Sequence, residues 1–223
     1  MELSLDLEQR LKKLVDVFLA ENANINLSAF RTPELCWMGN VMDSVAVLDV
    51  MTELGSPRIL DLGTGGGFPL LPLAICLPDA RLTGVDSVKK KLDAVGRIAA
   101  AMDLSNIELI TGRAEELGHD KKYREQFDIV TARAVAPINT LLEYCAPFVK
   151  KGGRVILWKS LDIEQELKES LLARAELSTH LIQQYKYSLG DQWGERQLLV
   201  FEKASVLSQK YPRGVGVPKK EPL

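Results

Sequence analysis

The sequence predicts an α/β fold: a mostly parallel, seven-stranded sheet with helices on both faces. Two observations predict this class. From Arg58 onward, short apolar runs alternate with helical patterns, which is the order of a parallel sheet covered by helices. The last two strand candidates have no helix between them, so they predict an antiparallel hairpin at one edge of the sheet. The chain length suits one domain with an appendage.

The region before Arg58 is predicted to be helical. Residues 4–21 place apolar side chains at helical spacing. Residues 33–54 form a second helical stretch, with Pro33 suited to its first turn and Gly55 to its end. We therefore expect an N-terminal helical extension over residues 1–57.

The sheet is expected within residues 58–204. Its strand candidates are short and apolar, and they lie at 58–63, 81–87, 107–113, 127–134, 154–160, 181–189 and 195–204. The helices between them are expected at 68–77, 88–103, 138–150 and 163–177. The remaining residues, 205–223, are rich in proline, glycine and lysine, so they predict an extended basic tail.

Composition excludes several classes of protein. The net charge is −2, so any contact with nucleic acid must come from a local basic patch. Three widely spaced cysteines and two histidines argue against a disulfide framework and against a metal site. The N-terminus is acidic, unlike a signal peptide, and the longest apolar run, 68–77, is too short to span a membrane. We expect a cytoplasmic monomer without membrane contact.

The stretch RILDLGTGGGFPLLPLAI, residues 58–75, joins the first strand to a glycine-rich turn. In an open parallel sheet, ligands bind beyond the carboxyl ends of the strands, where the strand order reverses. A P-loop needs a lysine and a Ser or Thr after its last glycine, and Phe68-Pro69 follows here. A dinucleotide fingerprint needs a glycine at the position of Phe68, so its strict form also fails.

S-adenosylmethionine is the third candidate ligand, and it has no pyrophosphate to seat. The Asp-x-Gly-x-Gly-x-Gly motif of residues 61–67 offers a backbone turn beside its methionine part. Asp86, after the second strand, offers a carboxylate for the ribose hydroxyls, and residues 113–116, after the third strand, lie where an adenine edge would be held. Taken alone, the glycines are equally consistent with a purely structural turn, and Asp86-Ser87 is consistent with a helix cap. Together, at three successive strand ends, they favour an adenosine-type cofactor.

Short motifs along nearly the whole chain carry a resemblance to a known family. They are Asn26–Ala29, Asp43-Ser44, Asp61–Pro69, Pro72–Ala74, Asp86-Ser87, Ala114-Glu115, Arg133-Ala134, Gly152-Gly153, Gly194–Arg196, Tyr211–Arg213, Gly216, Pro218, Lys220 and Pro222-Leu223. In these motifs the chain resembles the bacterial small-subunit rRNA guanine-N7 methyltransferase family, RsmG, formerly called glucose-inhibited division protein B. The resemblance implies a Rossmann-like class I methyltransferase fold and S-adenosylmethionine as methyl donor. It implies as acceptor a guanine in the decoding-region loop of 16S rRNA, free or within the small ribosomal subunit.

The resemblance also implies site residues. Gly63, Phe68, Ala114, Glu115 and Arg133 match the family's cofactor-contacting positions. For Arg133 we favour pairing with the methionine carboxylate or an RNA phosphate over a plain surface position. The full predicted cofactor site is Asp61, Gly63, Gly65, Gly67, Phe68, Asp86, Ser87, Ala114, Glu115 and Arg133.

Several positions depart from the family pattern. Gly39-Asn40 stands where the family usually has a histidine before Asp43-Ser44, and Gln197 stands where a histidine follows Arg196. Leu70 and Ser160 replace glycines. Most of these positions fall on the expected RNA side, so they bear on acceptor recognition more than on cofactor binding.

Guanine N7 carries an in-plane lone pair and no proton, so its methylation requires no general base and depends on placement. Residues 131–136 lack the Asn/Asp-Pro-Pro motif of amino-methylating enzymes, and no Pro-Cys pair offers a nucleophile. Candidate RNA-phosphate contacts are Arg31, Lys89, Lys90, Lys91, Lys159, Arg196, Arg213, Lys219 and Lys220. Lysines 89–91 read either as a solvated helix face or as a phosphate contact, and their position against the helix dipole favours the second.

Two alternative functions remain open from the sequence. One is a methyltransferase that uses S-adenosylmethionine on a different RNA, a protein or a small molecule. The other is an NAD-dependent oxidoreductase or a non-catalytic nucleotide-binding module.

Overall fold

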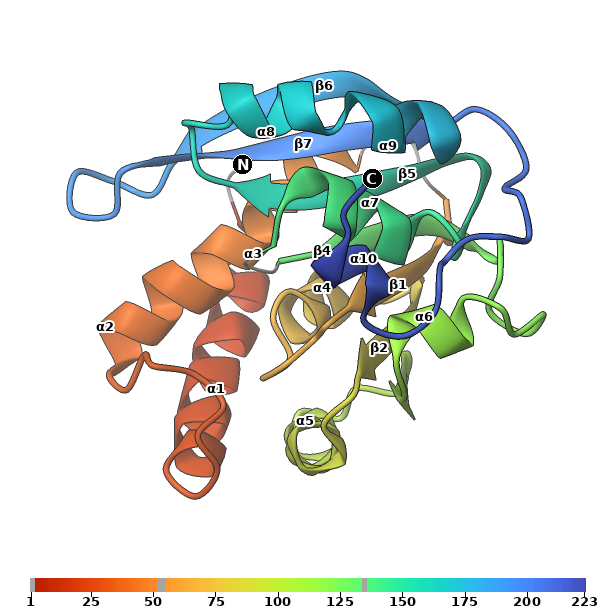
Figure 1. Cartoon of the computed structure of the whole chain (residues 1–223). Helices are drawn as coiled ribbons and strands as arrows, with labels where there is room; N and C mark the ends of the chain where they lie inside the picture. Colours follow the sequence, from red (N-terminus) through yellow and green to blue (C-terminus); the bar gives the residue numbers. More distant parts are fainter. Residues whose placement is uncertain (1–2, 52–54, 134–135) are drawn as a thin grey trace.

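The computed structural model describes residues 3–51, 55–133 and 136–223, and its strands form a seven-stranded sheet in the order β3-β2-β1-β4-β5-β7-β6 (Figure 1). The strands are β1 (Arg58–Leu62), β2 (Arg81–Asp86), β3 (Ile107–Thr111), β4 (Phe127–Ala132), β5 (Val149–Lys159), β6 (Thr179–Ser188) and β7 (Glu195–Lys203). The first five strands pair in parallel, and β7 runs antiparallel to both β5 and β6. The predicted fold class and the antiparallel edge hairpin are confirmed.

Two apolar clusters lie on opposite faces of the sheet, because alternate strand residues point to opposite sides. Ile59 and Ile156 belong to the cluster that includes α1, α4 and α5, whereas Leu60 and Val155 belong to the cluster that includes α7 and α9. The longer helices are α1 (Leu5–Asn22), α4 (Leu70–Cys76), α5 (Lys89–Ala101), α7 (Ile138–Cys145), α8 (Glu164–Glu169) and α9 (Leu171–Glu176). Because α1 shares a core with the sheet, the N-terminal extension is packed against it.

The predicted helix over 33–54 is not continuous. It consists of α2 (Pro33–Cys36), a π-helical segment Trp37–Met42, α3 (Asp43–Val45) and a 3₁₀ turn Ala46–Val50, and residues 52–54 lie outside the described part of the chain. In the π-helical segment the carbonyls of Gly39 and Asn40 accept hydrogen bonds from the Arg133 guanidinium, at 3.2 and 3.4 Å. The irregular backbone therefore offers two acceptors to the residue that follows β4.

The boundary between α7 and β5 also differs from the prediction. The helix ends at Cys145 instead of 150, and the strand begins at Val149 instead of 154. Gly152 and Gly153, which favour a turn in the sequence, lie inside the strand beside a register shift against β4. A Cβ on Gly153 would lie 2.7 Å from the carbonyl oxygen of Asp128, so this close approach requires glycine.

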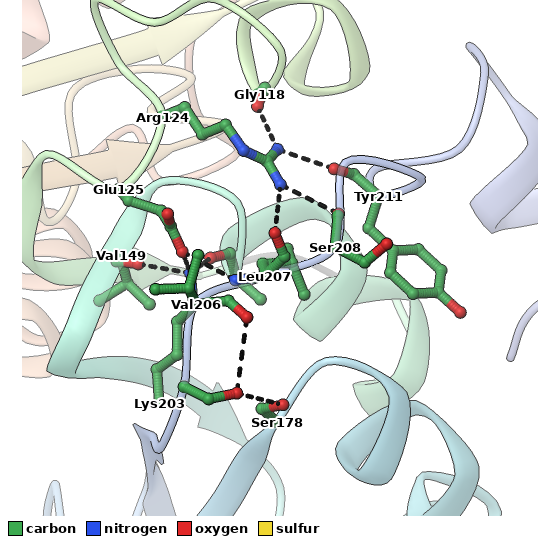
Figure 2. A network of polar contacts seen from close by, with 12 residues as sticks. Gly118, Arg124, Glu125, Val149, Ser178, Lys203, Val206, Leu207, Ser208 and Tyr211 are labelled. Carbon is green, nitrogen blue, oxygen red and sulfur yellow. Dashed lines mark hydrogen bonds and ion pairs between the residues drawn. The ribbon is translucent and has the colours of Figure 1, made fainter.

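The tail after β7 crosses α7 and contains a short helix, α10 (Val217–Lys220), which the sequence prediction of an extended tail omitted (Figure 1). Two buried cations anchor its start (Figure 2). The Lys203 ammonium contacts Glu125 at 2.6 Å and the carbonyls of Ala146 and Val149. The Arg124 guanidinium donates to four carbonyls, those of Gly118, Leu207, Ser208 and Tyr211. Because buried cations need such partners, both fix the path of the chain.

Candidate active site

The strand order reverses between β1 and β4, and two adjoining cavities open near the carboxyl ends of these strands. The glycine cavity, of about 260 Å³, is lined by Leu62, Gly63, Val85, Asp86, Ser87, Gly112, Arg113, Ala114, Glu115, Ala132, Ala136, Leu141 and Tyr144. The arginine cavity, of about 580 Å³, is lined by Phe30, Gly39, Asn40, Asp43, Arg133, Ala136, Pro137, Trp158, Lys159, Ser160, Glu166, Tyr187 and Arg196. Ala136 belongs to both linings, so the cavities meet there.

The glycine turn borders the glycine cavity through Gly63. Gly63, Gly65 and Gly67 adopt φ values of +73°, +54° and +93°, a left-handed conformation that favours glycine. The amide N–H groups of Gly63 and Thr64 donate to the carbonyl of Val85, at 2.8 and 3.0 Å, which ties the turn to β2. A Cβ on Gly63 would meet no atom within 4 Å, so this residue faces open space.

Asp86 fixes the glycine turn from the end of β2. Its Oδ2 accepts from the amide of Gly65 at 2.9 Å, and its Oδ1 accepts from the amide of Val88 at 2.8 Å. The N-cap of α5 is Val88, without a side-chain cap, so Ser87 is not the cap. An ionised carboxylate with two such bonds retains acceptor sites for hydroxyl groups of a ligand.

The acid after β3 is held by the C-terminal tail. Glu115 is buried in α6 (Ala114–Leu117), and its Oε1 accepts from the amide of Gly216 at 2.9 Å. Tyr144 of α7 lies in the same lining, and burial together with the negative charges of Glu115 and Glu143 raises its pKa, so its phenol stays neutral. The sequence carries no local signal for either the Gly216 contact or Tyr144.

Asp61 lies behind the glycine turn and is almost completely buried. Its Oδ1 accepts from the Thr131 hydroxyl at 2.9 Å, and the Thr64 hydroxyl and the Leu70 backbone also interact with its carboxyl group. Burial raises the pKa of Asp61 to about 6. Asp61 is not among the residues that line the glycine cavity.

The predicted cofactor residues therefore divide into three groups. Gly63, Asp86, Ser87, Ala114 and Glu115 line the glycine cavity directly. Asp61, Gly65, Gly67 and Phe68 lie outside that lining, and Arg133 lines the arginine cavity instead. The Phe68 ring lies between the N-terminal helix and Arg133. It packs edge-to-face on Phe18 of α1, with ring centroids 4.8 Å apart, and its centroid lies 5.8 Å from the Arg133 guanidinium carbon.

A charged network forms one wall of the arginine cavity. Arg133 donates to Oδ2 of Asp43 at 3.0 Å, and Oδ1 of Asp43 accepts from the Tyr187 hydroxyl at 2.7 Å. The Arg196 Nε lies 3.7 Å from the same Oδ1. The Asp43 side chain is only 4% exposed, so the network connects the N-terminal segment, β4, β6 and β7 in a desolvated setting. The sequence carries no signal for the Tyr187 contact.

Most of the positions that depart from the family pattern lie at or beside the same cavity. Asn40 accepts from Arg133 through its side-chain oxygen at 3.3 Å, and Ser160 lies in the lining. Gln197 donates to the Ser160 carbonyl at 2.6 Å, so two of the departures contact each other. Leu70 is fully buried in the core on α4.

The nine predicted phosphate contacts do not form one patch of free cations. Lys159 is directed to Glu166 and to the carbonyl of Ala136, both at 2.6 Å. Arg213 pairs with buried Glu143 at 2.6 Å and so holds the tail on α7. Lys89 pairs with Asp93 at 2.8 Å, and Arg196 lies in the arginine cavity. The exposed cations are Arg31, Lys89, Lys90, Lys219 and Lys220, and Lys91 is half-buried.

The described part of the chain comprises residues 3–51, 55–133 and 136–223. Within these ranges no group of three or more His, Cys, Asp or Glu side chains is placed to hold a metal ion. No helix there is long and apolar enough to cross a membrane.

Comparisons with known proteins decide the family. The family GidB, described as rRNA small subunit methyltransferase G, matches residues 7–198 of this chain. The chain belongs to this family. A member from Leuconostoc mesenteroides is 36% identical over 219 residues, covering 96% of this chain and 90% of its own length. A member from Lactobacillus helveticus is 39% identical over 214 residues, covering 95% and 89%. Both are called ribosomal RNA small subunit methyltransferase G.

Solved structures place the fold of this GidB member among methyltransferases. TYW2 from M. jannaschii, solved in complex with AdoMet, has a TM-score of 0.57 at 15% identity, covering 74% of this chain and 76% of its own. TrmN from Thermus thermophilus has a TM-score of 0.55 at 22% identity, covering 72% and 48%. The family and the fold confirm the predicted methyltransferase and decide against the oxidoreductase alternative.

Proposed function

We propose that this chain transfers the methyl group of S-adenosylmethionine to N7 of a guanine in the decoding-region loop of 16S rRNA. The observation that carries the proposal is the pair of cavities that meet at Ala136. One is built from the glycine turn and two acidic strand ends, and the other from the N-terminal segment and cationic side chains. An rRNA acceptor is consistent with work in the cytoplasm.

The glycine cavity has the donor and acceptor set that S-adenosylmethionine needs. Asp86 would accept the ribose hydroxyls, and Ala114 and Glu115 would border the adenine. The open backbone at Gly63 leaves room for the methionine part of the cofactor. When bound, the cofactor supplies an electrophilic methyl group on its sulfonium.

The arginine cavity suits a nucleophile that needs no deprotonation. Among its lining residues Asp43 is paired with Arg133, and Glu166 is paired with Lys159. Burial and the adjacent Asp43 charge raise the pKa of Tyr187, so its hydroxyl stays protonated. Guanine N7 would attack with its own lone pair, so no residue of this lining would need to remove a proton. The protein therefore contributes orientation and exclusion of water.

Exposed cations would guide the RNA toward this cavity. Arg31 follows the N-terminal helix, Lys89 and Lys90 begin α5, and Lys219 and Lys220 lie on α10. Arg213 and Lys159 carry internal ion pairs, so we assign them to positioning the tail and the cavity wall. A loop RNA with an unstacked guanine is the form of acceptor that a cavity can receive.

The deciding experiment is transfer of labelled methyl from S-adenosylmethionine to protein-free 16S rRNA and, separately, to small ribosomal subunits. We expect label in one of these acceptors, recovered as 7-methylguanine after digestion and mass analysis. Label on another atom, or on neither acceptor, would refute the proposal. A parallel calorimetric titration with S-adenosylhomocysteine tests the glycine cavity independently of any RNA.

A further inference from the structure

An aromatic pair borders the arginine cavity on the side of the N-terminal extension. Phe30, between α1 and α2, lies in the cavity lining. Its ring packs edge-to-face on Trp193, with centroids 5.4 Å apart and planes at 70°. Trp193 lies in the turn between β6 and β7, and both side chains are only half-buried. Two segments that are remote in sequence therefore meet here through their rings.

Glycine at position 39 makes this pair possible. A Cβ on Gly39 would lie 2.4 Å from Cε2 of Phe30 and 2.8 Å from Cζ3 of Trp193. No side chain fits there unless both rings move, so the rings pack directly on the backbone of the π-helical segment. The carbonyl of the same Gly39 accepts from Arg133, which places the aromatic pair and the arginine on one short piece of backbone.

The other aromatic residues of the lining, Trp158 and Tyr187, are both held by hydrogen bonds to Asp43. The buried Trp158 donates its indole N–H to the Asp43 carbonyl at 2.8 Å, and Tyr187 donates to the Asp43 carboxylate. Phe30 differs, because its ring has no polar group and is held by packing. A planar base that entered this cavity would need an apolar surface against its face.

We propose that Phe30 is the stacking surface for the acceptor guanine, and that Trp193, packed over Gly39, is a positioning residue that holds the Phe30 ring. This inference rests on the proposed function, because it assigns the arginine cavity to the acceptor base. Replacing an aromatic side chain that stacks on a base with alanine weakens nucleic-acid binding about 5- to 150-fold. The effect depends on the presence of the base, which makes it separable from folding.

The test is a thermodynamic cycle with the full chain saturated with S-adenosylhomocysteine. One RNA is a 16S rRNA fragment that contains the decoding-region loop, and the other has an abasic site in place of the target guanine. We expect Phe30→Ala to weaken binding of the guanine RNA about 5- to 150-fold and to change binding of the abasic RNA less than twofold. Phe30→Tyr should retain wild-type affinity. Tyr123→Ala, a half-buried aromatic residue in neither lining, is the matched control and should bind both RNAs normally.

The positioning role has its own variants. Trp193→Ala should give a smaller loss, again confined to the guanine RNA, and Trp193→Phe should restore it. Gly39→Ala should act in the same direction although both rings remain. Equal losses of Phe30→Ala on both RNAs, or no loss on either, would overturn the stacking proposal. Methyl transfer by the wild-type chain to the unmodified fragment is scored separately, so a failure of the proposed function is distinguishable from a failure of the stacking role.

Discussion

The two cavities differ in how the chain assembles them. The glycine cavity draws most of its lining from the ends of three successive strands, between Leu62 and Glu115. The arginine cavity draws on segments from Phe30 to Arg196, and a buried acid, Asp43, connects several of them. Cofactor binding is thus built into the local order of strand and turn, whereas the acceptor site depends on long-range packing. A substitution that disrupts one cavity should therefore leave ligand binding in the other largely unchanged.

We expect the largest effect from Asp43→Ala. The substitution leaves the Arg133 guanidinium without its carboxylate in a mostly buried position, and removing one member of a buried ion pair costs about 3–5 kcal/mol. Urea unfolding measures this loss. In the fraction that remains folded, methyl transfer to rRNA should be abolished while S-adenosylhomocysteine binding changes less than threefold.

Asp49→Ala is the matched control for this substitution, because Asp49 lies in the same segment, accepts from Tyr185 and is only half-buried. Water can solvate the groups it leaves behind, so the expected loss of stability is smaller. Cofactor affinity that falls in parallel with methyl transfer in Asp43→Ala would contradict the independence of the two cavities.

The buried acid behind the glycine turn should make stability depend on pH. Burial raises the pKa of Asp61 from 3.8 to about 6, so the folded chain binds this proton more tightly than the unfolded chain. Its contribution to stability is complete below about pH 4 and is lost as the pH rises through 6, a change of about 3 kcal/mol. Urea unfolding of Asp61→Asn should lack this component, whereas Asp93→Asn, exposed on α5, should retain it.

Asp86→Ala tests the glycine cavity directly. The change removes the carboxylate that orders the Gly65 and Val88 amides and that would accept the ribose hydroxyls. We expect a loss of about 100-fold in affinity for S-adenosylhomocysteine by calorimetry, since hydrogen bonds to a charged group are each worth about 1.5–3 kcal/mol. RNA affinity in filter binding should change less than threefold, and Asp93→Ala should bind S-adenosylhomocysteine as the wild type does. Comparable losses for both ligands would contradict the assignment.

The contrast between local strand ends and long-range packing also explains which features the sequence predicted and which it did not. Strand ends and glycines are local signals, so the spacing predicts the fold class and the strand-end residues Gly63, Asp86 and Glu115 of the glycine cavity, but not Tyr144. The predicted strand begins at 154 because the glycines at 152 and 153 interrupt its apolar pattern, whereas in the structure they lie inside the strand at a register shift. The sequence also gives no sign that Lys159 and Arg213 pair with Glu166 and Glu143, because charge along a chain does not reveal an internal partner. Such partners are fixed only by tertiary packing.

The smallest expected effect concerns the C-terminal tail, which contacts the cofactor side of the protein and also carries exposed lysines for RNA. Gly216 holds Glu115 at the glycine cavity, while the adjacent Lys219 and Lys220 are exposed on α10. Replacing both lysines with alanine should weaken RNA binding about threefold to tenfold. It should also make the negative slope of log affinity against log salt shallower by about 1.4, because each phosphate contact on single-stranded nucleic acid contributes about 0.7. Cofactor affinity should not change, since the Gly216 contact uses backbone. The exposed pair Lys121 and Lys122, replaced in the same way, should leave the slope unaltered. A lowered cofactor affinity in the Lys219→Ala/Lys220→Ala variant would mean that the tail couples the two cavities through Glu115 instead of serving them separately.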